Sequence, residues 1–106
     1  MPFLNLDQTP HRIAGAANFQ VINIAPVMML RVTIQPHTQL PAHAHENFQM
    51  GFVLACSGAL TIGDESARVS PGVAYTIPAN VLHDLQKEEE SLELLDIYYP
   101  PKEDRV

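Results

Sequence analysis

The sequence predicts an all-β protein, arranged as a sandwich or barrel of the jelly-roll kind. Two observations support this fold class. Helical periodicity is almost absent, and short runs of aliphatic and β-branched residues alternate with polar ones. Turn residues separate these runs at regular intervals, which is typical of antiparallel jelly rolls.

The clearest strand covers residues 28–34. Its even-numbered positions are all large and apolar, and Met29, Arg31 and Thr33 stand between them. Successive side chains of a strand point to opposite faces, so the even positions should face the core and Arg31 should face water. The other expected strands cover residues 19–24, 42–45, 49–55, 60–62, 73–77, 83–86 and 92–99.

The chain length favours one domain. A chain of 106 residues, 46% apolar, can form one core that buries roughly two-thirds of the unfolded surface. Residues 1–17 have no clear period, so we expect an arm that lies over the barrel or reaches a neighbouring subunit. Residues 18–106 then form a single barrel domain.

Composition excludes several classes of protein. A net charge of −6 would repel a nucleic acid backbone. No apolar run approaches the roughly 20 residues that span a bilayer. Cys56 is the one cysteine and no leader pattern is present, so we expect a cytoplasmic protein without disulfides.

The candidate chemistry lies in three histidines. His43 and His45 are two residues apart, so on one strand they would project from the same face. Gln49 follows after a turn, and His83 would join from a distant hairpin. Imidazole suits transition metals, although a His-x-His pair alone is also common among hydrogen-bonded surface histidines.

The surroundings of these residues resemble the two motifs of the cupin superfamily. His43, His45 and Gln49 followed by Gly58 are similar to the first motif, and Gly72, Pro78, Asn80 and His83 are similar to the second. The resemblance implies a cupin jelly-roll barrel, also called a double-stranded β-helix. It also implies that His43, His45, Gln49 and His83 bind one divalent transition metal ion, such as Zn, Ni, Mn, Fe or Co.

The sequence departs from the cupin motifs at three places. His37 stands where the first motif begins with glycine, and Asn80 replaces a turn glycine. Asn tolerates a left-handed backbone, whereas His37 is strained if its turn needs positive φ. The segment from Gln49 to Gly58 is about two residues longer than usual, so a bulge or longer hairpin is expected near Cys56.

Within the cupins, the sequence resembles the small pectin-degradation proteins of the KdgF type. The most specific match is the ending around residues 95–104, similar to that family's Asp-x-Phe-x-Pro-Pro-Arg-Glu-Asp. The family's functional positions correspond to Asp96, Tyr98 and Lys102, which the resemblance implies are catalytic. Tyr98 and Lys102 depart from the family's Phe and Arg, and Lys lacks the bidentate fork that suits a carboxylate.

This resemblance implies a metal-dependent isomerase or tautomerase. Its substrate would be an anionic unsaturated uronic-acid monosaccharide from pectin or alginate, and its reaction would be ring opening. Neutral ligands leave the metal charge uncompensated and favour Lewis acidity, while Asp96 would transfer protons. The alternatives are an oxygen-activating cupin with Fe, Mn or Cu, and a non-catalytic cupin that binds a sugar or effector.

Two further expectations concern assembly and Cys56. Exposed sheet edges and the apolar residues of the arm, which include Phe3, Leu4, Leu6 and Ile13, favour a two-fold homodimer. Cys56 has no resolving partner, so we expect a structural, mostly buried thiol.

Overall fold

The computed structural model describes residues 3–15, 17–86 and 88–103. Parts of the expected arm (residues 1–2 and 16), Lys87 and the end of the terminal motif from Asp104 lie outside the described residues. Within those ranges, no helix has the length and apolar character needed to cross a membrane.

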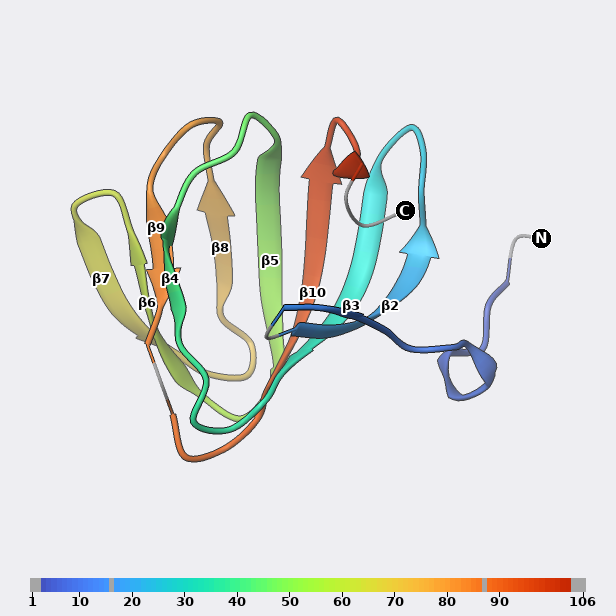
Figure 1. The fold of residues 1–106 in the computed structure, drawn as a ribbon, viewed down its shortest axis with the longest axis horizontal. Coiled ribbons are helices and arrows are strands. Elements are labelled where there is room, and N and C mark those ends of the chain that lie inside the picture. The colour runs from blue at the N-terminus through green and yellow to red at the C-terminus, as the bar shows by residue number, and fades with distance from the viewer. Residues whose placement is uncertain (1–2, 16, 87, 104–106) are drawn as a thin grey trace.

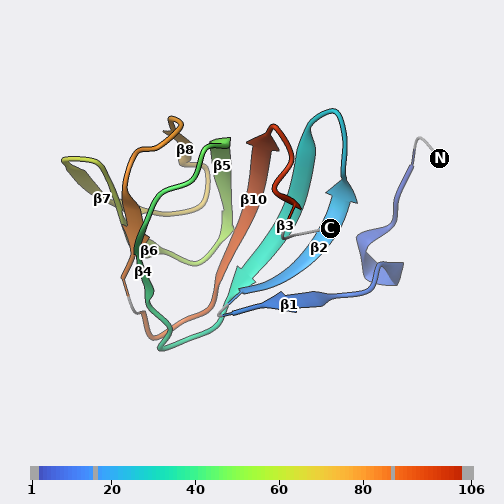
Figure 2. The same cartoon turned by 45° about the horizontal axis from the view of Figure 1, so that its top comes forward.

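Within the described residues, ten strands form two antiparallel sheets (Figure 1). The larger sheet has the order β1-β2-β3-β10-β5-β8, and the smaller has the order β4-β9-β6-β7. The strands are β1 (Arg12–Ala14), β2 (Ala17–Asn23), β3 (Met28–Ile34), β4 (Leu40–His43), β5 (Phe48–Ala55), β6 (Gly58–Ile62), β7 (Glu65–Val69), β8 (Ala74–Ile77), β9 (His83–Leu85) and β10 (Leu92–Tyr99). The two sheets face each other as walls of one jelly roll, which the turned view shows (Figure 2). This confirms the predicted fold class.

The core lies between the sheets and follows the predicted alternation. In β3, Met28, Leu30, Val32 and Ile34 are all buried, while Arg31 lies on the outer face in an ion pair with Glu93. Strand β10 alternates in the same way. Burying each large aliphatic side chain stabilises the fold by roughly 1.5–3 kcal/mol, so these two central strands hold the barrel together.

The N-terminal segment packs over the larger sheet. A 3-10 helix, η1 (Leu6–Gln8), precedes β1, which pairs with β2 at the sheet edge. The buried amide of Gln20 in β2 donates hydrogen bonds to the carbonyls of Leu6 and Thr9. These bonds fix the segment on the barrel, although Phe3 and Ile13 remain exposed.

Several local expectations need correction. Strands β1 and β7 were not predicted, because β1 has three residues and four of the five β7 side chains are exposed. The strand expected at residues 42–45 runs from Leu40 to His43 and ends before His45. The first predicted strand, residues 19–24, is observed as β2 at Ala17–Asn23.

The two altered motif positions, His37 and Asn80, have left-handed backbone geometry, and so does Cys56. His37, Cys56 and Asn80 have φ values of 61°, 66° and 65°, in the left-handed region that favours glycine. A register shift between Glu93 and Leu94 also places a bulge in β5, opposite β10. Cys56 is only half-buried, contrary to expectation, because it occupies the turn after β5.

Candidate metal centre

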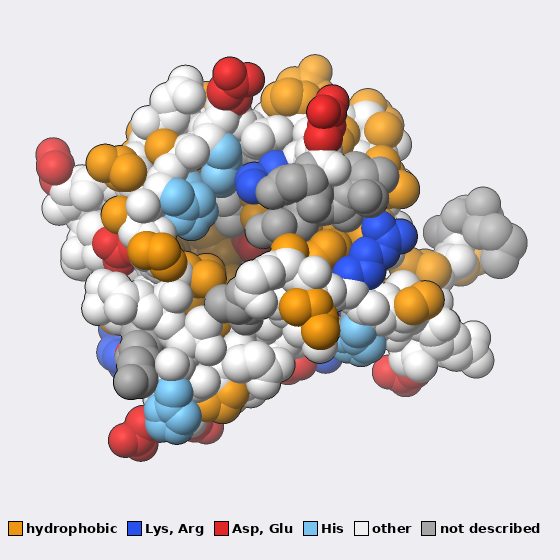
Figure 3. Space-filling view, viewed as in Figure 1, with side chains coloured by type: hydrophobic (Ala, Val, Ile, Leu, Met, Phe, Trp, Pro, Cys, Tyr) orange, Lys and Arg blue, Asp and Glu red, His pale blue; other side chains and the backbone are white. Residues whose placement is uncertain are grey.

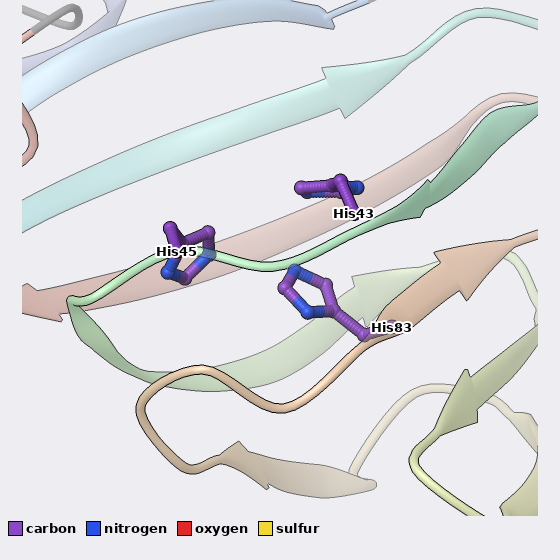
Figure 4. A group of neighbouring side chains, drawn as sticks. All are labelled: His43, His45 and His83. Atoms are coloured by element: carbon purple, nitrogen blue, oxygen red, sulfur yellow. The ribbon is translucent and has the colours of Figure 1, made fainter.

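Three imidazoles converge between the sheets. His43 ends β4 and pairs in register with His83 at the start of β9, while His45 lies in the loop two residues farther on. Ring centroids are 4.2 Å apart for His43 and His83, and 4.9 Å apart for His45 and His83. One nitrogen from each ring lies within 4.8 Å of the others (Figure 4). The three predicted imidazoles therefore lie together, although the loop after β4, and not a strand, places His45.

Backbone carbonyls fix the tautomer of all three rings. Nδ1 of His43 lies 2.9 Å from the Pro41 carbonyl, Nδ1 of His45 lies 2.9 Å from that of Asn47, and Nδ1 of His83 lies 3.0 Å from that of Val81. A carbonyl only accepts hydrogen bonds, so each Nδ1 carries the proton. Each Nε2 then presents a lone pair, as metal-binding histidines do when the other nitrogen donates to the backbone.

Burial favours the neutral form of two of these imidazoles. The pKa of His45 is lowered chiefly by desolvation, and the positive charge of Lys102 lowers it further. The pKa of His83 is also lowered, first by burial and then by the other two imidazoles. Metal ligands must be unprotonated, so these shifts favour metal binding at neutral pH.

Gln49 lies beside the imidazoles on the inner face of β5. Its side chain is 6% exposed, and Oε1 is 3.1 Å from Nε2 of His45. With Nδ1 of His45 protonated, both atoms offer lone pairs, and a cation between them would make both of them ligands. If the amide turned over, it would instead donate to His45 and close the pair without a cation. Gln49 as a ligand stays a prediction.

The predicted catalytic pair lies on the inner face of β10. Asp96 is 4% exposed and Tyr98 is 6% exposed, and both line a cavity of about 90 Å³ together with His43, Gln49 and His83. The Tyr98 ring stands edge-on to His45, with centroids 5.8 Å apart. In Figure 3, pale-blue imidazoles gather beside a hollow in this face of the molecule. Asp96 and Tyr98 are two residues apart on one strand and therefore project from the same face, which here is the inner one.

The C-terminal tail reaches the same site. Nζ of Lys102 lies 6.0 Å from the centroid of the Tyr98 ring. Asn47 anchors this tail, because its Nδ2 donates to the carbonyls of Pro100 and Pro101 at 2.6 and 3.3 Å. The backbone carbonyl of Asn47 also accepts the hydrogen bond from Nδ1 of His45. Glu46, next to Asn47, is exposed.

Sequence reasoning missed Tyr75, which lies on β8. Its hydroxyl donates a 2.7 Å hydrogen bond to Oδ1 of Asp96, and its ring lines the same cavity. Gly51, which pairs with Tyr75 in register, was a partial signal. A glycine inside a strand pattern often marks a close approach, but it does not identify the residue that approaches.

The donor set fits a first-row transition metal. Three neutral imidazole nitrogens and one amide oxygen match the ligands that Zn, Ni, Mn, Fe and Co accept in proteins. The three backbone carbonyls accept hydrogen bonds from these rings and hold them in orientation, as the partners of metal-binding histidines do.

Comparison with solved structures supports the fold. KdgF from Halomonas sp. is 21% identical and superposes with a TM-score of 0.88, covering 98% of this chain and 99% of that one. An RmlC-like cupin from Shewanella frigidimarina is 21% identical with a TM-score of 0.88, and the match covers 100% of this chain and 96% of that one. The polyketide cyclase RemF from Streptomyces resistomycificus is 18% identical with a TM-score of 0.79, and the match covers 92% of this chain and 78% of that one.

Identities this low establish the shared fold alone. No functionally curated protein matches the sequence. The family model described as "Cupin domain" matches residues 30–98, which span all three histidines and most of both sheets. The chain therefore belongs to the cupin-domain family.

Proposed function

We propose that this protein is a metal-dependent enzyme that opens the ring of unsaturated uronic-acid monosaccharides. The observation that carries the proposal is a shared cavity, lined by His43 and His83 of the imidazole cluster, by Gln49 and by a buried carboxylate, Asp96. The resemblance of the C-terminal segment to the KdgF type also supports it.

The bound metal would supply a Lewis acid that polarises the anomeric oxygen of the sugar. Asp96 then removes the proton from the anomeric hydroxyl, and the bond between the anomeric carbon and the ring oxygen breaks. Its electron pair leaves on the ring oxygen, which becomes an enolate and takes the proton back. The resulting enol tautomerises to a ketone, so the ring alkene is lost and no co-reactant is needed.

Two other side chains would bind the sugar. Tyr98 offers an aromatic wall beside His45, and Lys102 offers a positive charge near the same ring. A sugar carboxylate near Lys102 would gain a charge-assisted contact, without the bidentate geometry of arginine.

The experiment has two parts. The metal content of protein purified without chelators is measured first, and we expect about one transition metal ion per chain. The metal-loaded protein is then mixed with unsaturated galacturonate, and loss of the alkene absorbance is compared with the spontaneous rate. Chelated protein should match the spontaneous rate.

The alternatives give different results. Oxygen uptake with a reduced metal, without loss of alkene, would favour an oxygen-activating cupin. Tight sugar binding without turnover would favour a binding protein. Absence of metal, with these side chains splayed apart in an experimental map, would remove the basis of the proposal.

A further inference from the structure

Gly51 lies between two polar residues that contact each other across it. It sits in β5, where the register pairs it with Asp96 of β10 on one side and with Tyr75 of β8 on the other. Neighbouring strands are about 4.8 Å apart, so Tyr75 must reach across two strand spacings, roughly 10 Å between backbones. Its hydroxyl nevertheless donates to Oδ1 of Asp96 at 2.7 Å.

The missing side chain of Gly51 makes this reach possible. A Cβ atom built on Gly51 would overlap the ring and the hydroxyl of Tyr75. The φ angle of Gly51 is not in the left-handed region, so its backbone does not call for glycine. The requirement is steric, because the phenol ring occupies the space directly above the strand.

The hydrogen bond is well suited to hold a carboxylate in a fixed orientation. Both partners line the cavity that His43 and His83 also line, and Asp96 is 4% exposed. Burial, followed by the charge of Asp96, raises the pKa of Tyr75 well above its usual value. Tyr75 therefore remains a donor throughout the neutral range, and a hydroxyl bonded to a charged acceptor makes one of the stronger hydrogen bonds.

We propose that Tyr75 is a positioning residue that orients the Asp96 carboxylate toward the metal cavity, and that Gly51 provides the gap through which Tyr75 reaches it. The catalytic consequence rests on the proposed function, because Asp96 is there the group that transfers protons. The orientation itself does not depend on which substrate is bound.

The first test measures orientation without turnover. In ¹³C-labelled protein, the carboxyl resonance of Asp96, identified by its loss in Asp96→Asn, should move in Tyr75→Phe. Tyr99→Phe is the matched control, because it deletes the same hydroxyl from a residue that is 60% exposed. We expect no movement there. An Asp96 resonance unchanged by Tyr75→Phe would overturn the positioning role.

The second test measures turnover of unsaturated galacturonate. Tyr75→Phe should lower kcat about tenfold to a hundredfold, the range for loss of a hydrogen bond to a charged group. KM should change less than about twofold, and metal content should stay the same. An unchanged kcat would contradict the proposal. A wild type inactive on every uronate would instead refute the proposed function, while the Asp96 resonance still decides the role of Tyr75.

The third test examines the gap at Gly51 by thermal unfolding. Gly51→Ala should destabilise the wild type strongly, or prevent folding, because the new methyl group displaces the ring. In a Tyr75→Ala background the space is vacated, so Gly51→Ala should cost far less. Such non-additivity is the signature of direct contact. Equal destabilisation in both backgrounds would show that Gly51 does not serve Tyr75.

Discussion

Replacing Asp96 by Asn tests the chemistry of the cavity most directly. Asn has the shape of Asp but no negative charge, and its Oδ1 can still accept the hydrogen bond from Tyr75. Because Asp96 is 4% exposed, an isosteric change preserves the packing of β10. The substitution therefore removes a proton acceptor with little effect on the fold.

The expected loss is large. Removing a positioned proton-transfer group typically lowers the rate by about 10²–10⁴. This range corresponds to roughly 3–5 kcal/mol of transition-state stabilisation. Because the imidazoles and Gln49 are untouched, metal content should stay the same.

Loss of the ring-alkene absorbance gives kcat and KM, and elemental analysis gives the metal per chain. Glu46→Gln is the matched control, because Glu46 is the acid next to the metal loop but is exposed to solvent. We expect wild-type rates from this variant. A fully active Asp96→Asn enzyme would refute the reasoning and assign proton transfer to another group.

Three other predictions concern stability, the thiol and assembly. Because the pKa values of His45 and His83 are lowered on folding, metal-free protein should lose stability as pH falls below the unfolded value of about 6.5, and a Tm that rises between pH 6.5 and 5 would contradict this. Burial and then Glu90 raise the pKa of Cys56, so a thiol reagent should label it more slowly than free cysteine at pH 8, and faster in Glu90→Gln. Light scattering should show a homodimer at micromolar concentration, weakened by Ile13→Asp on the exposed edge strand; a wild-type monomer would refute the dimer.

Sequence patterns predicted the parts of the fold that depend on burial. The alternation in β3 follows directly from large apolar side chains at every second position. Strand β7 gave no such signal, because an edge strand with exposed Glu65 and Ser66 is held by backbone pairing with β6. Strand pairing of this kind leaves little trace in hydropathy.

The candidate site was predictable where a motif specified it. His43, His45 and His83 could be grouped because their spacing matches cupin motifs. Tyr75 could not, because its role depends on the register of β8 against β5, which the sequence does not state. A single-residue shift of that register would turn Tyr75 to the outer face.

Asn47 connects the metal loop to the C-terminal tail, since its carbonyl holds His45 and its amide holds Pro100 and Pro101. Lys102 follows directly after this anchor. If displacement of the tail weakens metal binding through His45, thermodynamic linkage requires the metal to stabilise the docked tail by the same factor. Metal binding and the position of Lys102, the cation proposed to bind substrate, would then be thermodynamically coupled.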